Sequence, residues 1–506
     1  MADRQPNIIF IMADDHAAKA ISHYGHGLNS TPNIDRLGDE GMRLNHCYVT
    51  NSICTPSRAA ILSGTYNHVN GVTTLVTGLN NRAPHLAKHL RQVGYRTGMV
   101  GKWHLGEGAA HEPTGFDYWS VLPGQGDYFD PMFIGPDGEG REPGYVTDII
   151  TDKCLDWMAN GGDDKPFFLM CHHKAPHRNF APHPKNRGMF EGEEITLPDT
   201  FDDDYKNRAR ASRDAKMRIR SDFEYEDLGL AQPEGGDEVG VIHMEGKPGR
   251  KIPDPDDVRD LVLVDVNTGE RFTFHDKQQL DRFKYQRYIK RYLQTVASID
   301  ESVGRLLDWL DETGQAENTI VIYTSDQGFF LGEHGWFDKR FMYEESLQMP
   351  FLIRYPAAIA AGGICDDLVC NVDFAPTLLG YAGAPVPTYM QGRDFGKLLA
   401  GETPPDWQQV VYHRYWMHKD ESHNAFAHYG IRNQRYKLIY WYNDALDQPG
   451  AFMGDEPPEW EMFDCQEDPL ELFNVYDDSA YASERVDLLS QLDAMMAEIG
   501  DIPEHR

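Results

Sequence analysis

Acidic and amide side chains follow two predicted strands at the points where those strands end. Asp14 and Asp15 come directly after an apolar run near the start of the chain, and Asp326 and Gln327 follow a second run far along it. Because functional groups gather at the carboxyl ends of strands in parallel α/β sheets, we expect the two pairs to converge. Three carboxylates and one amide oxygen suit a hard divalent cation, Ca²⁺ or Mg²⁺. Each pair taken alone is more typical of a turn or a helix cap.

A cysteine is predicted to lie at the start of a helix. Pro56 suits a first helical turn, the helix would run to about Ser63, and Gly64 would end it. Cys54 would then lie at the helix N-terminus, where free N–H groups and the helix dipole attract an anion such as sulfate. A buried or merely reactive thiol is the alternative interpretation.

Basic side chains are predicted just beyond the ends of further strands and shortly after the proposed metal residues. They are Lys102, His104, His177 and Lys339. Any one of them, taken alone, is typical of ordinary surface charge. Because all four fall close to predicted strand ends or to the proposed metal residues, they are expected to form a local cationic pocket.

The elements that must position these groups alternate between strands and helices. The predicted strands are Ile8–Met12, Thr97–Val100, Phe167–Cys171 and Thr319–Tyr323, and the predicted helices include Pro84–Val93 and Leu280–Thr313. This alternation predicts an α/β fold with a mostly parallel central sheet.

Two further regions do not follow this alternation of strands and helices. Residues 186–276 are rich in charge and read as an insertion, either a substrate lid or a surface excursion; within them Val262–Phe274 is expected to form a hairpin around Asn267-Thr268-Gly269. A catalytic domain over residues 1–400 is expected, followed by a C-terminal subdomain over 401–506. Its strands are predicted at Val410–Tyr415 and Tyr436–Tyr442, and a terminal helix at Ser483–Ile499.

The cysteine motif and the Lys-His segment carry a family resemblance. C-T-P-S-R from Cys54 to Arg58, continued by A-A-I-L-S-G-T-Y, and G-K-W-H-L-G from Gly101 to Gly106 resemble two signatures of the type I sulfatases. The resemblance covers essentially the whole chain and extends to the carbohydrate-acting bacterial sulfatases. It implies an alkaline phosphatase-like sandwich with a smaller C-terminal α+β domain, which contains a small antiparallel sheet and a terminal helix.

The resemblance also implies a nucleophile and a metal site. In this family the cysteine at the position of Cys54 is oxidised by a formylglycine-generating enzyme to formylglycine, whose hydrate attacks the sulfate ester and forms a covalent sulfo-enzyme intermediate. One Ca²⁺, or less readily Mg²⁺, is held by the formylglycine and by residues at the positions of Asp14, Asp15, Asp326 and Gln327.

The same resemblance assigns roles to the basic residues. Arg58 would polarise the sulfate oxygens with the metal, and Lys102 would add charge beside formylglycine. His177 and Lys339 would assist the leaving oxygen, and His104 would remove a proton so that sulfate is expelled. In the C-terminal subdomain, which often closes the substrate pocket in the family, the candidate substrate-binding residues are His413, Arg414, Trp416 and His418. An ordinary polar sheet face is an equal alternative for these four.

Composition excludes some partners. The chain of 506 residues has 48 Lys and Arg against 80 Asp and Glu, a net charge of −32, so neither nucleic acid nor an anionic membrane is expected as a partner. An enzyme of anionic esters must then hold its positive charge locally. No stretch approaches the about 20 apolar residues that a membrane helix needs.

The cysteines and the N-terminal residues give expectations about the cellular compartment of the protein. Seven dispersed cysteines fit buried thiols in a reducing compartment, although Cys365 and Cys370 are near enough in sequence to pair. The chain as written shows no signal peptide, so a cytoplasmic location is expected, or a periplasmic or secreted one if a leader was removed.

The sequence favours hydrolysis of sulfate monoesters, with a sulfated sugar as the leading substrate and aryl sulfates next. One alternative is a phosphate or phosphonate monoester hydrolase of the same superfamily. Another is a non-catalytic sulfate-binding protein, should Cys54 stay unmodified. The particular sugar, its sulfated position and any homo-oligomeric state are left open.

Overall fold

The computed structural model describes residues 5–162, 165–232 and 254–505, and its centre is a mixed ten-stranded sheet. The five middle strands are all parallel: β12 (Thr319–Ser325), β1 (Asn7–Asp14), β8 (Phe167–Pro176), β4 (Arg96–Lys102) and β5 (Tyr118–Leu122). Beyond them lie β15 (Phe351–Arg354), β2 (Met42–Leu44) and β16 (Gly363–Cys365) on one side, and β6 (Met132–Gly135) and β7 (Gly138–Arg141) on the other. The predicted α/β class with a largely parallel centre is confirmed, and antiparallel pairing is confined to the flanks.

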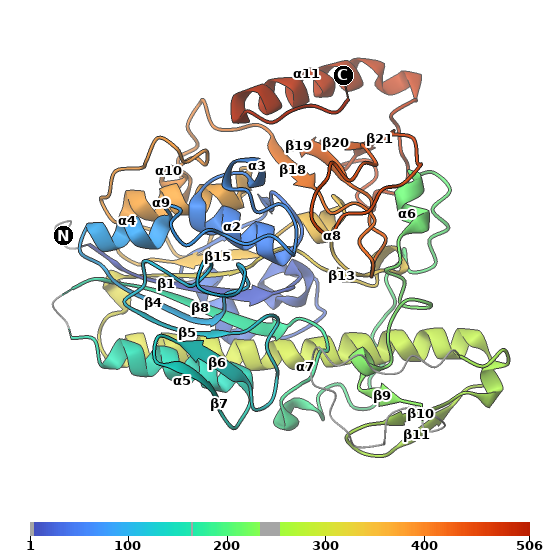
Figure 1. The fold of residues 1–506 in the computed structure, drawn as a ribbon, viewed down its shortest axis with the longest axis horizontal. Coiled ribbons are helices and arrows are strands. Elements are labelled where there is room, and N and C mark those ends of the chain that lie inside the picture. Colours follow the sequence, from blue (N-terminus) through green and yellow to red (C-terminus); the bar gives the residue numbers. More distant parts are fainter. Residues whose placement is uncertain (1–4, 163–164, 233–253, 506) are drawn as a thin grey trace.

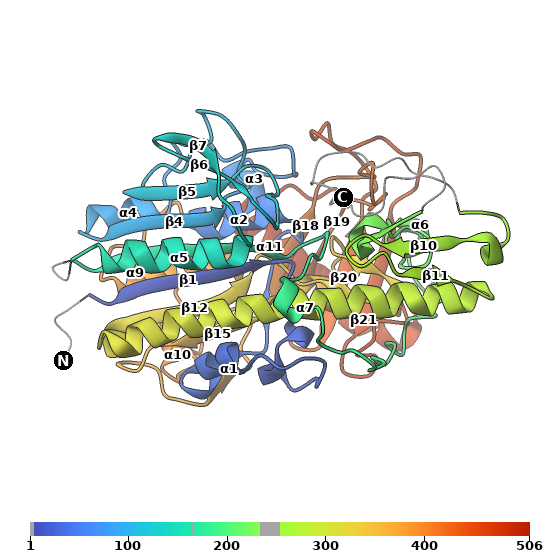
Figure 2. The same ribbon diagram turned by 90° about the horizontal axis from the view of Figure 1, so that it is seen from below.

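Alternating side chains of β1 fill two separate cores. Ile9 and Ile11 pack under α1 (Pro32–Asp39), α5 (Val146–Ala159) and α7 (Lys277–Glu312). Phe10 and Met12 pack on the opposite face, under α2 (Cys54–Ser63), α4 (Leu86–Gln92) and α9 (Phe374–Tyr381). Figures 1 and 2 show these two helical layers with the sheet between them. A strand covered on both faces must be apolar throughout, which explains the continuous run near the N-terminus.

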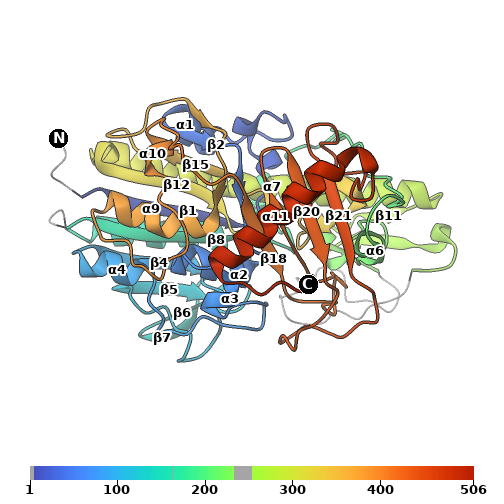
Figure 3. The same ribbon diagram turned by 90° about the horizontal axis from the view of Figure 1, so that it is seen from above.

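A second sheet follows near the C-terminus. It is antiparallel and consists of β18 (Val411–Tyr415), β19 (His428–Arg432), β20 (Tyr436–Trp441) and β21 (Glu459–Asp464). Helix α11 (Ala482–Ile499) lies across it (Figure 3). Its buried residues share one apolar cluster with the main sheet, so the two sheets are packed together. The predicted small sheet and terminal helix are confirmed, while the boundary near residue 401 stays a prediction.

The segment expected to be an insertion packs along the N-terminal half of α7. Its described parts contain α6 (Arg210–Asp214), β9 (Leu230–Ala231), β10 (Val262–Asp265) and β11 (Arg271–Thr273). Strands β10 and β11 pair antiparallel, which confirms the predicted hairpin. Residues 233–253 lie outside the described residues, and the role of the segment as a lid stays a prediction.

Short elements complete the described chain: β3 (Cys47–Tyr48), β13 (Phe330–Leu331), β14 (Phe337–Asp338), β17 (Val369–Cys370), α3 (Asn67–Asn70), α8 (Glu344–Leu347) and α10 (Gly396–Leu399). All seven cysteines are free thiols, so Cys365 and Cys370 are not paired. Among the described helices, none has the length and apolar character needed to cross a membrane.

Helix α1 is held against α7 by a buried carboxylate. The backbone N–H groups of Asn33 and Ile34 each donate to Asp300 Oδ1 over 2.9 Å, and Asn33 Nδ2 donates to Oδ2 over 2.8 Å. These N–H groups belong to the first helical turn and have no partner within α1. Asp300 therefore satisfies them from another element and fixes the helix beside the sheet.

Replacing Asp300 by Ala should lower the free energy of unfolding by about 1–3 kcal/mol, because buried N–H groups would lose their acceptor. The matched control is Asp308→Ala on the same helix, whose carboxylate is 63% exposed and pairs with Arg36 at the surface. That control should cost less than about 1 kcal/mol. Guanidinium denaturation of both variants measures the difference, and equal losses would contradict the capping role.

Candidate active site

Three carboxylates meet at the carboxyl end of two neighbouring strands. Ala13 of β1 lies beside Ser325 of β12, so Asp14 and Asp326 leave the sheet at the same level. Asp15 adopts a left-handed backbone with φ of 68°, and its N–H donates to Asp326 Oδ1 over 3.1 Å. One oxygen from each of the three carboxylates lies within 4.8 Å of the others, and all three side chains are buried. The predicted convergence is therefore present.

The oxygen atoms of this cluster fit a divalent cation. Gln327 Nε2 donates to Asp15 Oδ1, while its Oε1 is buried with no hydrogen-bond donor among the described residues. Burial raises the pKa of Asp15 to about 7 and that of Asp326 to about 6, and the neighbouring carboxylates add to both shifts. An orphaned acceptor and crowded carboxylates are what a hard cation would relieve.

Cys54 begins α2 and points at this cluster. Its Sγ lies 3.4 Å from Asp14 Oδ1, and the helix ends at Gly64 with φ of 67°, as predicted. The Ser57 hydroxyl donates to the backbone oxygen of Asp326 and accepts from Asn371 Nδ2 over 3.0 Å, which ties α2 to β12. Burial and the charge of Asp14 raise the pKa of the Cys54 thiol well above its ordinary value. As a thiol, residue 54 would be a weak nucleophile at neutral pH.

Arg58 connects three elements from one helical turn beyond Cys54. Its Nε donates to Asp326 Oδ2 over 3.0 Å, its Nη2 lies 2.8 Å from the same oxygen, and its Nη1 donates to the backbone oxygen of Lys102 over 2.9 Å. The side chain is 2% exposed. Arg58 thus neutralises part of the carboxylate cluster and fixes the end of β4 against α2.

Lys102 reaches the cluster because a glycine precedes it. A Cβ on Gly101, whose φ is 98°, would lie 1.9 Å from the backbone oxygen of His172 in β8, so only glycine allows this approach. The Lys102 ammonium pairs with Asp14 and also donates to Gln125 Oε1. Burial would raise the pKa of Asp14, but Lys102 and the other cations outweigh it and hold that pKa well below its ordinary value.

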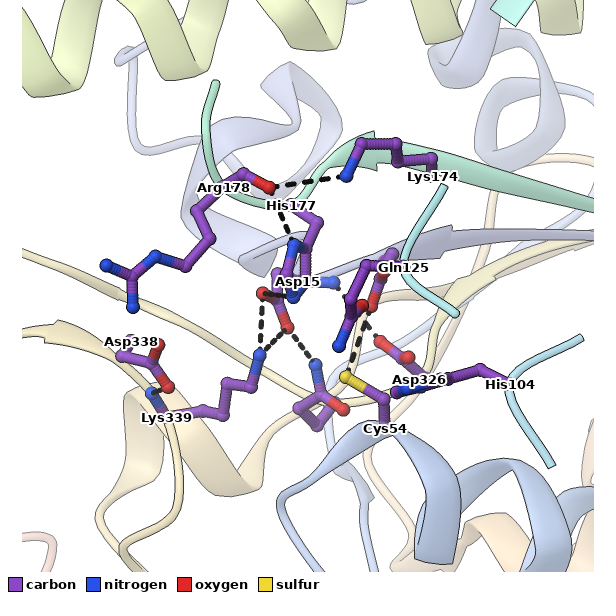
Figure 4. A network of polar contacts seen from close by, with 12 residues as sticks. Asp15, Cys54, His104, Gln125, Lys174, His177, Arg178, Asp326, Asp338 and Lys339 are labelled. Atoms are coloured by element: carbon purple, nitrogen blue, oxygen red, sulfur yellow. Dashed lines mark hydrogen bonds and ion pairs between the residues drawn. The ribbon is translucent and has the colours of Figure 1, made fainter. Parts of the chain in front are cut away.

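Lys339 and His177 both approach Asp15 (Figure 4). Lys339 Nζ lies 2.7 Å from both Asp15 oxygens, and His177 Nε2 lies 3.7 Å from Asp15 Oδ2. The second ring nitrogen, His177 Nδ1, lies 2.8 Å from the backbone oxygen of Arg178 and must donate to it. When His177 is neutral, its Nε2 therefore carries a lone pair that faces the site. Burial and the charge of Lys102 hold the His177 pKa well below its ordinary value.

His104 approaches from the loop after β4. Its φ is 51°, and its Nδ1 lies 3.4 Å from Thr55 Oγ1, next to residue 54. Burial and Lys102 lower the pKa of His104 well below its ordinary value, so the ring is neutral and suited to accept a proton.

The structure brings together the metal, nucleophile and cationic candidates, while the four C-terminal candidates have contacts of their own. His413 Nδ1 bonds to the Val49 backbone oxygen over 2.9 Å, and Arg414 pairs with Asp501 over 2.9 Å. The Arg414 guanidinium stacks 3.7 Å from the Trp416 ring centre, and His418 Nδ1 accepts from the Ala427 N–H over 3.1 Å. Their role in binding substrate stays a prediction.

Sequence reasoning did not identify some polar residues of this region. Gln125 follows the short strand β5 and contacts Lys102. Beside Lys339, Asp338 pairs with Arg340 and lies 3.3 Å from His423 Nε2. The position of Gln125 shortly after a strand end could have identified it as a site residue. The contact between Asp338 and His423 joins residues far apart in the chain, so no local sequence pattern predicts it.

Comparison with known proteins finds similarity to sulfatases, both in the family models that match and in one relative. A family model described as Sulfatase matches residues 6–384, and one described as N-sulphoglucosamine sulphohydrolase, C-terminal, matches residues 332–498. The chain is 42% identical over 504 residues to an N-acetylglucosamine-6-O-sulfatase of Bacteroides thetaiotaomicron, covering 98% of this chain and 87% of that protein.

Solved structures show the same likeness. One protein, solved in complex with its substrate D-glucosamine-2-N,6-O-disulfate, is 39% identical, with a TM-score of 0.86 over 99% of this chain and 100% of that one. A phosphonate monoester hydrolase of Agrobacterium radiobacter shares the fold at 20% identity, with a TM-score of 0.69 over 98% of this chain and 96% of that one. The expected alkaline phosphatase-like architecture is therefore confirmed.

Binding of Ca²⁺ to metal-free protein should release on the order of one proton at pH 6 and far fewer at pH 8.5. The reason is that Asp15 and Asp326, with pKa values raised to about 7 and about 6, hold protons at pH 6 that a cation must displace. Calorimetry in two buffers of different protonation enthalpy measures the release.

Asp326→Ala should lose the metal and this proton release together. Asp373→Asn is the matched control, because burial also raises the pKa of Asp373 to about 6 while its hydrogen bonds go to other residues, Cys370 and Arg393 among them. The control should leave the release unchanged. Undiminished Ca²⁺ binding by the Asp326 variant would contradict the assignment.

Proposed function

The chain belongs to the sulfatase family of sulfuric ester hydrolases, and we propose that it removes the 6-O-sulfate group from glucosamine residues of sulfated saccharides. Support for this substrate comes from the relative named as an N-acetylglucosamine-6-O-sulfatase and from the structure solved with a disulfated glucosamine. Both cover nearly the whole chain, including the C-terminal sheet.

The observation that carries the proposal is the position of Cys54. It lies at a helix N-terminus, 3.4 Å from Asp14 Oδ1, with buried cations on two sides. Because the thiol itself would be a weak nucleophile there, we infer that Cys54 is oxidised to formylglycine, whose hydrate supplies the attacking hydroxyl. A Ca²⁺ ion held by Asp14, Asp15, Asp326 and Gln327 would add Lewis-acid stabilisation of the sulfate oxygens.

The cationic side chains bind and orient the sulfuryl group. Arg58 and Lys102 are fixed by Asp326, Asp14 and Gln125, so they present charge without reorganising when the substrate binds. Lys339 contributes from the opposite side through its contacts to Asp15. This arrangement favours the transition state, in which charge on the sulfuryl and leaving oxygens is redistributed.

His177 and His104 handle protons at the leaving group and the nucleophile respectively. Free His177 is neutral, with Nδ1 donating to Arg178, so Nε2 must first gain a proton to act as an acid. The negative charge of a bound sulfate ester raises the His177 pKa and favours that protonation. His104, which is neutral beside residue 54, would accept the proton of the second hydroxyl at residue 54, so that sulfate is expelled.

A substrate panel tests the proposal. We expect kcat/KM to be highest for 6-O-sulfated N-acetylglucosamine or N-sulfoglucosamine, lower for the 3-O-sulfated isomers and for 4-nitrophenyl sulfate, and lowest for 4-nitrophenyl phosphate. A preference for the phosphate would support the phosphomonoesterase alternative, and binding of the sugars without turnover would support a non-catalytic protein. Either result would refute the proposed function.

His177→Ala should reduce turnover of the sugar sulfate by about 10²–10⁴-fold and that of 4-nitrophenyl sulfate much less. A sugar alkoxide needs a proton to leave, whereas a nitrophenolate hardly does. Lys339→Ala should show the same bias to a smaller degree, and Arg58→Ala should harm both substrates alike.

The control for this comparison is His183→Ala. His183 lies six positions beyond His177 and contacts Asp148 over 3.4 Å, so its loss should leave both rates nearly unchanged. Measuring kcat/KM for each variant on both substrates decides the role of His177. Equal losses on the two substrates would mean that His177 binds sulfate and does not protonate the leaving oxygen.

A further inference from the structure

Arg291, in the middle of α7, is a buried arginine that has no counter-ion among the described residues. Its side chain is 9% exposed, its Nε is enclosed without an acceptor, and its guanidinium forms no ion pair or hydrogen bond within the described part of the chain. The other buried arginines all pair with carboxylates: Arg58 with Asp326, Arg340 with Asp338, Arg354 with Glu40, Arg414 with Asp501 and Arg432 with Glu344. Among the buried arginines of the described residues, Arg291 is therefore the exception, because the others pair with a carboxylate.

The guanidinium of Arg291 lines a cavity of about 60 Å³ between α7, the loop after β8 and the β10–β11 hairpin. Polar walls come from Asn179, Arg187, Glu226 and Asn267. On this measure one water molecule needs about 10–15 Å³, so the cavity has room for a small polyatomic anion. Figure 2 shows the hairpin beside α7.

A glycine opens the cavity to the guanidinium. Gly229 has φ of 63°, and a Cβ there would lie 2.6 Å from Arg291 Nη1. The Gly229 backbone oxygen accepts from the Val266 N–H over 3.1 Å, which fixes the hairpin turn beside it. A side chain at position 229 would displace the tip of Arg291, and the left-handed backbone at the end of Glu226–Leu228 independently favours glycine there.

Within residues 5–162, 165–232 and 254–505, cationic side chains outnumber carboxylates in the wall of this cavity. Arg187 adds a second cation, and Arg287 is already paired with Asp265. The carboxylate in the wall, Glu226, accepts from Asn179 Nδ2 over 3.2 Å. Burial lowers the pKa of Arg291 to about 9, and Arg287 adds to the shift, but the group remains a cation at neutral pH. A buried cation without a partner is costly, even in a protein whose net charge is −32.

We propose that this cavity is a second oxyanion site, in which Arg291 offers a forked pair of donors and Arg187, Asn179 and Asn267 complete the shell. The ligand is a tetrahedral oxyanion: either free inorganic sulfate or phosphate, or a sulfate group carried by a saccharide. Guanidinium groups bind such oxygens bidentately. The site is separate from the catalytic carboxylates and goes beyond the proposed hydrolysis.

The site adjoins the loop that carries His177. Asn179 lies two residues beyond His177, and the intervening Arg178 is held by Asp227, whose neighbour Glu226 holds Asn179. The same loop therefore faces the catalytic site through His177 and the second site through Asn179. An oxyanion bound at Arg291 would sit against the segment that positions the catalytic imidazole.

Selenate, which has the shape of sulfate and an anomalous signal, locates the ligand directly. Crystals of the intact protein soaked in millimolar selenate should show an anomalous peak within hydrogen-bond reach of Arg291 Nη1 and Nη2, besides any peak at the catalytic site. Arg291→Met crystals should keep the catalytic peak and lose this one. No peak at Arg291 in the wild-type protein overturns the proposal.

Stability in sulfate gives an independent readout in solution. Without added oxyanion, Arg291→Met should be at least as stable as wild type, because it removes an unpaired buried charge. Sulfate should then stabilise wild type saturably and this variant much less, with the affinity of the Arg291 site falling at least about tenfold. Arg282→Met, an exposed arginine on the same helix, is the matched control and should behave as wild type. Destabilisation of Arg291→Met with an unchanged sulfate response would mean that Arg291 is purely structural.

The two ligand sources are separated by a competition. Inorganic sulfate is compared with a sulfated disaccharide that the enzyme does not hydrolyse, each added to wild type and to Arg291→Met. Tighter binding of the disaccharide that is lost in the variant assigns the site to a substrate sulfate. Equal or weaker binding assigns it to the free anion, and no dependence on Arg291 for either probe refutes the site.

Discussion

The active site depends on the mutual neutralisation of buried charges at one edge of the sheet. Asp14, Asp15 and Asp326 lie together with almost no solvent, and such a group of carboxylates would be strongly unfavourable alone. Arg58 of α2 and Lys102 of β4 pair with these carboxylates, and the ion pairs connect the helix that begins at Cys54 to the central sheet. Lys339 pairs with the third carboxylate, Asp15, and the buried Gln327 Oε1, which has no donor among the described residues, leaves an oxygen that a divalent cation could bind.

The need to neutralise these buried charges explains why strand ends and a helix N-terminus meet at one place. Parallel strands deliver Asp14, Lys102 and Asp326 to the same level, and α2 brings Cys54 to them with its N-terminus foremost. Two cores on opposite faces of the sheet hold these ends still. The cations are therefore fixed before substrate arrives, and a sulfuryl group meets a preorganised field.

Much of this follows from the sequence, for identifiable reasons. The buried run before Asp14 and the Pro56–Gly64 helix signals predicted the elements that carry the metal residues and Cys54, because local patterns determine them. The partners of Asp338 and Gln125 did not follow, since these contacts join segments whose spacing carries no period. Arg291 was correctly expected on a helix, but its lack of a counter-ion within the part of the chain that the structure describes depends on packing, which the sequence pattern does not determine.

The central claim is that residue 54 acts as formylglycine and not as cysteine, and mass spectrometry of the active protein tests it most directly. Samples produced with different amounts of a formylglycine-generating enzyme would contain different fractions of residue 54 that have lost sulfur. If residue 54 acts as formylglycine, kcat on a 6-O-sulfated glucosamine should rise in proportion to that fraction and extrapolate to zero without it. Full activity in a sample that retains an intact thiol at residue 54 would exclude this role.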